Sequence, residues 1–387
     1  MRGVHVSASV RRLPIEGGLL LFDASGNNLF AFNETAGHAW DLLAAGRCDE
    51  ELVNEFAAWW GIPAARAGSD LSAILAQWGR LGLVTGPDFA SAPALVRPGS
   101  TQVSVAQSCR SQSISAWTCT IRGISIAFAI EGQFGQTIRS LFQQLENPDA
   151  VPETRLEVRP VAGDEMVLLT DGTERIRTAD SGQLVGAVYQ TVLERIHPGI
   201  NWLAIIHGAA VAHRGAGLAL PGPSGSGKST LAAALLAAGY DYLADDMIAL
   251  AAPDGAILPW PLPLSIKPGS ITAVAAQYPE LAEAPSYRTK GVDARLLIPP
   301  MTAWDAAPTS LRFLIFPRFS AGASAELRRI SAFEAVKQLL ADRIWFGYPI
   351  TEARVTAFLN RLNDSAAYAL TYGELGQAVR LVEQVAR

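Results

Sequence analysis

The sequence predicts an α/β fold, a mixed sheet with flanking helices, preceded by a small winged-helix-like α+β domain. Two observations favour this class. A glycine-rich segment, residues 222–229, lies between an apolar run and a helix-forming run, the order in which α/β domains place a phosphate-binding loop. Ahead of it, residues 1–90 read as a β-hairpin followed by three amphipathic helices.

Composition sets limits on the class of protein. The chain has 387 residues, of which 49% are hydrophobic and 17% are charged, as is typical of a folded globular protein of two or three domains. Its net charge of −5 argues against an electrostatic nucleic-acid binder, which needs a basic surface. We find neither a membrane-spanning run nor a secretory signal. The three cysteines lack metal-type spacing, so we expect them to be reduced, in the cytoplasm.

The first domain is expected to occupy residues 1–90. Two apolar runs, residues 20–22 and 29–32, flank the turn signal Ser25-Gly-Asn-Asn28 and predict a hairpin. Asn33 is expected to cap the first helix. Helices are predicted at residues 34–44, from about 49 to 60 and from about 67 to 81, with short strands at 4–10 and 83–84.

This domain carries a family resemblance. The pattern L-L-F-D-A-S-G-N-N-L-F-A-F-N-E-T-A-G-H-A-W-D-L-L, followed by two amphipathic helices and L-G-L-V, resembles the PqqD family over nearly all of residues 15–85. The resemblance implies that the last helix and a strand edge hold a leader peptide. We therefore expect the leader of a precursor peptide to be a partner of residues 1–90. The alternative is an accessory folding domain that binds no ligand.

The next segment is expected to be a linker, at residues 91–102, because prolines recur there without apolar periodicity. Residues 103–387 are expected to form one domain, with its core at about residues 200–320 and a helical C-terminal segment. Before the core, strands are predicted at residues 117–121, 124–130, 154–161 and 165–169, and helices at 136–145 and 181–196.

The glycine-rich loop reads G-x-x-x-x-G-K-S, which predicts a nucleoside triphosphate as ligand. Glycines let backbone N–H groups turn towards phosphate oxygens, and the following helix adds its partial positive charge. Lys228 is expected to reach the terminal phosphates, and the Ser229 hydroxyl to ligate Mg²⁺. The residues expected to bind the nucleotide are Gly222, Pro223, Ser224, Gly225, Ser226, Gly227, Lys228, Ser229 and Thr230.

Two acids and a histidine accompany the loop. Asp245 and Asp246 lie within residues 240–250, an apolar run that predicts the next strand. Buried acids are costly unless a positive group meets them, and Mg²⁺ beside ATP is the natural partner. The alternative is a turn at the end of a strand. His207, in an apolar run before the loop, is by itself more typical of a satisfied core residue.

Four segments together resemble the catalytic core of HPr kinase/phosphorylase over about residues 205–251: I-H-G-A-A-V, L-P-G-P-S-G-S-G-K-S-T, a helix ending in G-Y, and L-A-D-D-M-I. The resemblance implies ATP and Mg²⁺ as cofactors and a homo-oligomeric assembly. It places His207 near the phosphate that is transferred. It gives Lys228 the role of neutralising the charge of that phosphate. It gives metal binding to Ser229 and Asp245 and the role of general base to Asp246. The residues themselves are equally compatible with the two aspartates exchanging roles.

The chain departs from the HPr enzymes downstream of this core. Those enzymes carry an E-x-R-G-x-G run, and residues 251–310 contain none. This difference puts the reverse, phosphorolytic activity and specificity for HPr in doubt. Lys267, Arg288 and Lys290 are candidates for holding the transferred or acceptor phosphate, with a solvated loop charge as the alternative for each.

Joined together, the two halves predict a kinase that transfers the γ-phosphate of ATP to a hydroxyl, expected to be a serine, of a precursor peptide held by the first domain. Two alternatives stay open: a kinase for a small hydroxyl-bearing metabolite, and a non-catalytic, nucleotide-dependent regulatory protein. A simple nucleotide switch does not need His207 beside two adjacent acids. That combination therefore favours an enzyme.

Overall fold

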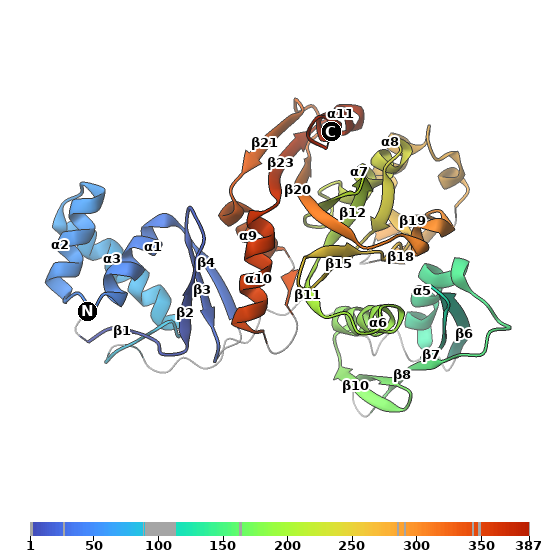
Figure 1. Ribbon diagram of the computed structural model, residues 1–387, viewed down its shortest axis with the longest axis horizontal. Helices are drawn as coiled ribbons and strands as arrows, with labels where there is room; N and C mark the ends of the chain where they lie inside the picture. The colour runs from blue at the N-terminus through green and yellow to red at the C-terminus, as the bar shows by residue number, and fades with distance from the viewer. Residues whose placement is uncertain are drawn as a thin grey trace. The chain divides into compact units, whose positions relative to one another are not determined.

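The computed structural model describes residues 3–25, 28–87, 89, 114–161, 165–284, 286–289, 292–342, 344–346 and 350–386 (Figure 1). The chain divides into two compact units. The first consists of Met1–Arg97 with Arg328–Ala369, and the second of Pro98–Leu327 with Leu370–Arg387. The expected linker, residues 91–102, lies outside the described residues.

The N-terminal part of the first unit contains the predicted hairpin and the predicted three helices. Its antiparallel sheet has the order β2-β3-β4, formed by β2 (Val10–Leu13), β3 (Leu19–Asp23) and β4 (Asn28–Phe32). The helices are α1 (Glu34–Ala44), α2 (Asp49–Trp60) and α3 (Ala64–Arg80). The expected single strand over residues 4–10 is wrong. Its start forms β1 (His5–Val6), which pairs with β5 (Val84–Thr85), and Val10 already belongs to β2.

The helices form because local signals and one apolar core agree. The Asn33 side chain accepts a hydrogen bond from the Ala36 amide and so caps α1, as the sequence predicted. Trp40 of α1 and Trp78 of α3 meet edge to face, with ring centroids 5.2 Å apart. Leu19 and Leu21 of β3 belong to the same core. The three helices therefore cover one face of the sheet.

The C-terminal segment of the first unit covers the other face, an arrangement that the sequence did not predict. It contains α9 (Ala332–Ala341), β22 (Ile344–Trp345) and α10 (Glu352–Asn363). All five residues of β3 are buried, although side chains on a strand alternate between its two faces. Phe22 of β3 pairs with Leu29 of β4. Leu29 in turn borders one narrow apolar gap, too small for a water molecule, together with Val336 of α9 and Phe358 of α10.

This packing explains why residues 328–369 separate from the domain at 103–387 that the sequence predicted. Side chains on the second face of β3 need an apolar cover, and α9, which lies against β4, supplies it. Gly18, just before β3, marks the contact: a Cβ added there would lie 2.3 Å from the Phe333 ring of α9.

Gly18→Ala is therefore expected to destabilise the first unit by about 1–3 kcal/mol, because the buried Phe333 ring would have to move. Gly68→Ala is the matched control. Its added Cβ would meet only Val53, at 4.0 Å, and alanine is the better helix former by about 1 kcal/mol. Hydrogen exchange of the β3 amides measures both changes. Equal protection of β3 in the two variants would refute the contact between α9 and the sheet.

The second unit begins with a five-stranded sheet of order β10-β9-β8-β7-β6. Its strands are β6 (Ile114–Ile121), β7 (Ile124–Glu131), β8 (Thr154–Pro160), β9 (Met166–Thr170) and β10 (Thr173–Thr178). The helices α5 (Gly132–Phe142) and α6 (Ser181–Ile196) pack against it. The bounds of α6 are those predicted, whereas β10 was not predicted.

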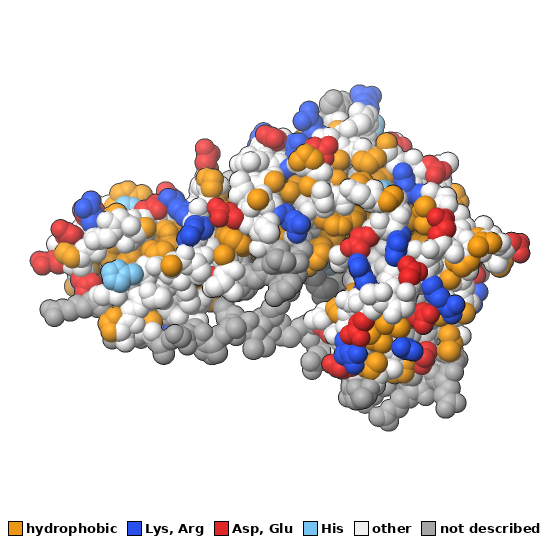
Figure 2. Space-filling view, turned by 60° about the horizontal axis from the view of Figure 1, so that its bottom comes forward, with side chains coloured by type: hydrophobic (Ala, Val, Ile, Leu, Met, Phe, Trp, Pro, Cys, Tyr) orange, Lys and Arg blue, Asp and Glu red, His pale blue; other side chains and the backbone are white. Residues whose placement is uncertain are grey.

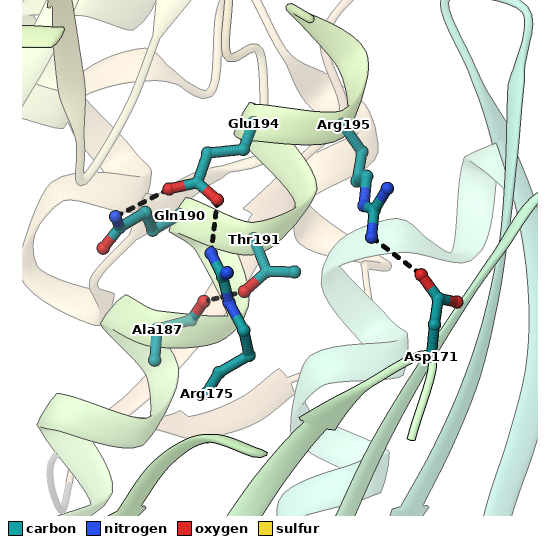
Figure 3. A network of polar contacts seen from close by, with 7 residues as sticks. All are labelled: Asp171, Arg175, Ala187, Gln190, Thr191, Glu194 and Arg195. Carbon is teal, nitrogen blue, oxygen red and sulfur yellow. Dashed lines mark hydrogen bonds and ion pairs between the residues drawn. The ribbon is translucent and has the colours of Figure 1, made fainter. Parts of the chain in front are cut away.

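Polar contacts fix α6 on the β9–β10 hairpin (Figure 3). Arg175 of β10 and Gln190 both contact Glu194, and Arg195 reaches Asp171 in the hairpin turn at 2.7 Å. These groups are partly exposed, and such pairs contribute at most about 1 kcal/mol each. The network therefore sets the register of the helix more than the stability of the unit.

A larger mixed sheet follows, with the order β14-β12-β13-β20-β16-β15-β11 in the second unit. Its strands are β11 (Trp202–Ile206), β12 (Gly208–His213), β13 (Ala216–Pro221), β14 (Asp241–Ala244), β15 (Ile248–Ala251), β16 (Ala256–Leu258) and β20 (Thr309–Phe319). The helix α7 (Lys228–Ala237) follows β13 and packs on β12 (Figure 1). β13 and β20 run parallel, so their carboxyl ends meet at one edge.

Smaller elements complete the second unit. They are β17 (Leu264–Ile266), β18 (Ser286–Thr289) and β19 (Val292–Leu297), which form a sheet of order β17-β19-β18, and the helices α8 (Pro268–Val274) and α11 (Leu375–Val385). Two strands, β21 (Glu326–Ile330) and β23 (Ala366–Tyr372), cross the unit boundaries. α11 packs on α7.

Basic and acidic side chains are interspersed on the face drawn in Figure 2, as the near balance of 31 Lys and Arg with 36 Asp and Glu leads one to expect. None of the described helices combines the length and the apolar character that crossing a lipid bilayer requires.

Candidate functional site

The glycine-rich loop joins the end of β13 to the start of α7, as predicted. Gly227, the N-cap of α7, has a φ of +96°, a backbone conformation that favours glycine. A Cβ there would also meet the Tyr372 hydroxyl at 2.2 Å. The Lys228 side chain is 8% exposed, and its Nζ lies 3.5 Å from the Pro223 carbonyl oxygen. The loop thus folds back over its own lysine.

Asp245 lies directly beneath the loop and is 3% exposed. The Ser229 hydroxyl donates to Oδ1 at 3.0 Å, and the Ser265 amide donates to Oδ2 at 3.3 Å. Burial, the largest cause, and the nearby Asp246 charge raise the pKa of Asp245 to about 6, although Lys228 and the two hydrogen bonds oppose the shift. A buried carboxylate and a buried ammonium therefore share one small site.

His207 and Asp246 form a second pair beside the first. His207 Nε2 lies 3.3 Å from Asp246 Oδ1, and the aspartate side chain is 55% exposed. Strand pairing explains the contact. The residue before His207 pairs with Ile248 of β15, and the residue after it pairs with Pro221, where the loop begins. The short step between β11 and β12 therefore carries the imidazole to both the acids and the loop.

The aspartates do not lie within a strand, so the expected strand over residues 240–250 is wrong. It is divided into β14, which pairs with β12, and β15, which pairs with β11 and β16. Asp246 has a φ of +65°, which a continuous strand does not allow. The turn that had been the alternative interpretation is what presents the two acids.

The three candidate phosphate contacts differ in where they lie. Lys267, the N-cap of α8, approaches the loop: its Nζ donates to the Ser224 hydroxyl at 2.6 Å. Arg288 lies on β18, which β19 separates from β17, and its side chain is outside the described structure. Lys290 lies outside the described residues. Of these candidates, the structure brings Lys267 to the loop.

Other groups reach the loop that sequence reasoning missed. The fully buried Tyr372 hydroxyl donates to the Gly227 carbonyl at 3.3 Å across 145 positions of sequence, and burial raises its pKa to about 12. The Ser265 amide approaches Asp245. No local sequence motif predicts either contact, because each contact joins segments that are far apart in the sequence.

The first unit offers a different kind of site, at the edge of its sheet. Among the described residues, no strand pairs with the outer side of β4, and all five of its residues are half-buried. Phe32 of β4 stacks on Phe30 and meets Trp78 of α3 edge to face, with centroids 6.1 Å apart. Within the described part of the chain, a strand edge that no other strand pairs with thus lies beside an aromatic cluster and a helix.

Comparison with known proteins identifies this part of the chain. Residues 18–84 match the PqqD family, described as coenzyme PQQ synthesis protein D. The PqqD-like domain thus spans β3 to the start of β5, whereas α9 and α10 lie outside the match. No curated protein matches the sequence. A solved structure described as "TbiB1 in Complex with the TbiA(beta) Leader Peptide" is 22% identical, covers 21% of this chain and 95% of that chain, and has a TM-score of 0.21.

The raised pKa of Asp245 predicts a pH dependence of stability in the absence of nucleotide and magnesium. The Asp245 carboxyl binds its proton more tightly in the folded state than in the unfolded state. The free energy of unfolding of the wild type should therefore fall as pH rises from about 4 to 6. Asp245→Asn carries no charge and should escape this loss, becoming up to about 3 kcal/mol more stable than wild type at pH 8.

Urea unfolding of the two proteins at pH 4 and pH 8 measures the difference. Asp241→Asn, which changes an exposed acid at the start of β14, is the matched control and should follow the wild type. Identical pH slopes for wild type and Asp245→Asn would mean that the carboxylate is not buried as described.

Proposed function

We propose that this protein is an ATP-dependent kinase that phosphorylates a hydroxyl of a ribosomally synthesised precursor peptide, whose leader is held by the PqqD-like domain. One observation carries the kinase part. Two side-chain pairs, Ser229 with Asp245 and His207 with Asp246, converge on the loop that holds Lys228 at the N-terminus of α7.

The loop is suited to a triphosphate. It leads into a ten-residue helix whose first amides and partial positive charge favour an anion. Lys228 and Lys267 add two cationic groups, one within the loop and one against Ser224. These groups match the charge of a nucleotide tail.

Ser229 and Asp245 would hold Mg²⁺. Hard oxygen ligands from one hydroxyl and one carboxylate, completed by phosphate oxygens and water, are what this ion prefers. Among the described residues, no group of three or more His, Cys, Asp and Glu side chains could hold a metal ion. When bound, Mg²⁺ would neutralise charge on the terminal phosphates.

The two aspartates have different surroundings, and these support different roles. Both oxygens of Asp245 accept hydrogen bonds under the loop, whereas Asp246 is open to solvent and held by His207. In the proposed reaction the acceptor oxygen attacks the γ-phosphorus and its proton passes to Asp246. The bond from the γ-phosphorus to the bridging oxygen breaks, and ADP leaves with that electron pair.

The leader part of the proposal is supported by the PqqD match and by the outer edge of β4, with which no described strand pairs. An extended peptide that adds a strand to a sheet edge gains main-chain hydrogen bonds, while side-chain pockets give specificity. Phe32 and Trp78 lie beside this edge. Holding the leader would raise the effective concentration of the acceptor at the kinase site, without new contacts there.

Transfer is tested with the full chain, labelled ATP, Mg²⁺ and the small peptides encoded beside its gene. We expect a phosphate on a serine or threonine of one peptide. Asp246→Asn should lower the rate by at least about 100-fold, since a general base contributes about 10²–10⁴, and should leave ATP affinity unchanged. Asp241→Asn should behave as wild type. Transfer to a free metabolite but to no peptide would overturn the proposed acceptor.

Leader binding is tested by hydrogen exchange with the same peptide. The amides of β4 should gain protection, because a new strand would pair with them. The β2 strand, at the opposite edge of the same sheet, is the internal control and should not change. A peptide that binds but protects β2, or neither edge, would refute docking at β4.

A further inference from the structure

Phe319 is a large apolar side chain of the second unit that is left 51% exposed. It is the last residue of β20. Its amide donates to the Ser226 carbonyl of the glycine-rich loop at 3.0 Å, and its ring meets the buried Tyr372 ring at a centroid distance of 5.7 Å. The main chain and one ring contact thus fix an aromatic side chain beside the loop, without covering it.

Phe319 and the acids approach the glycine-rich loop from different strands. β13, which leads into the loop, lies between β12 and β20. Asp245 and Asp246 lie between β14 and β15, and His207 lies between β11 and β12. Phe319 lies outside both connections, at the carboxyl end of β20, the strand parallel to β13, and ligands of α/β sheets bind at these ends.

We propose that Phe319 is the stacking platform for the base of the nucleoside triphosphate, an inference that rests on the proposed function. The γ-phosphate would point towards Asp246 and His207, and the opposite end of the nucleotide would extend towards β20. A base presents an apolar π-face, which an exposed aromatic ring can cover whatever the identity of the base. In this assignment the acceptor would bind beside Asp246.

Several contacts pre-organise the platform. The Ser320 amide donates to the Tyr372 carbonyl at 2.9 Å, and the Tyr372 hydroxyl donates to Gly227. β20, β23 and the loop are therefore tied together on both sides of Phe319. A ring held in place before binding loses little freedom when a base stacks on it.

The test compares ATP with inorganic tripolyphosphate, each with Mg²⁺, by calorimetry on the full chain. Tripolyphosphate carries the charge of the tail but has no base. Phe319→Ala should weaken ATP binding by about 5- to 100-fold, the effect of losing one base–aromatic stack, and should leave tripolyphosphate binding within about 2-fold. Phe319→Leu, which keeps apolar contact with Tyr372, should weaken ATP as well. Phe319→Trp should retain it.

Ile298→Ala, which truncates another exposed apolar side chain of the second unit, is the matched control and should bind both ligands as wild type does. Loss of both ligands in Phe319→Ala would show that the ring only supports the loop, and unchanged ATP binding would also overturn the inference. If Phe319→Ala binds ATP as wild type does but has a higher KM for the peptide, the ring serves the acceptor and the inference is likewise overturned.

The two proposals fail separately. ATP binding that depends on Phe319 without any phosphate transfer would refute the kinase and leave the stacking platform in place. Phosphate transfer by Phe319→Ala at the wild-type rate and with the same KM for ATP would refute the stacking platform and leave the kinase in place.

Discussion

Asp245 is a buried carboxylate, and the candidate site is built on that constraint. A charge in such a place must be matched by donors and by an opposite charge. Ser229 of α7 and the amide of Ser265 supply the donors, and Lys228 supplies the charge. Three segments, the loop helix, the step after β14 and β17, are thereby brought to one point. The hydrogen bonds and the opposite charge that stabilise the Asp245 carboxylate therefore define the site.

The step that places Asp245 also exposes Asp246. Asp246 has a left-handed backbone conformation between two strands. Its side chain and that of Asp245 therefore point into different surroundings, although the two residues are adjacent and of the same type. One carboxylate is buried beneath the loop, and the other is exposed and held by His207. This geometry separates roles that the aspartates could have exchanged on sequence grounds, and it supports Asp246 as the proton acceptor in the proposed reaction.

The first unit obeys a simpler constraint, the need to cover both faces of a short apolar sheet. A strand such as β3, with buried side chains on both faces, is typical of sheets packed between two layers. Here the layers come from opposite ends of the chain: α1–α3 on one face, and α9 with α10 on the other. The proposed docking edge of β4 thus belongs to a sheet completed by the C-terminal segment.

Local chemistry determined much of this protein from sequence. Short segments of sequence are enough to predict the cap at Asn33, the periodicity of α6 and the glycine-rich loop. The reason is that capping, amphipathicity and backbone freedom act over one or two helical turns. Only the tertiary structure decided the break at Asp246, the cover that Phe333 gives to Gly18, and the approach of Tyr372 and Phe319 to the loop. Those contacts join strands and helices distant in sequence, and no hydrophobic pattern encodes which distant partner a buried surface will find.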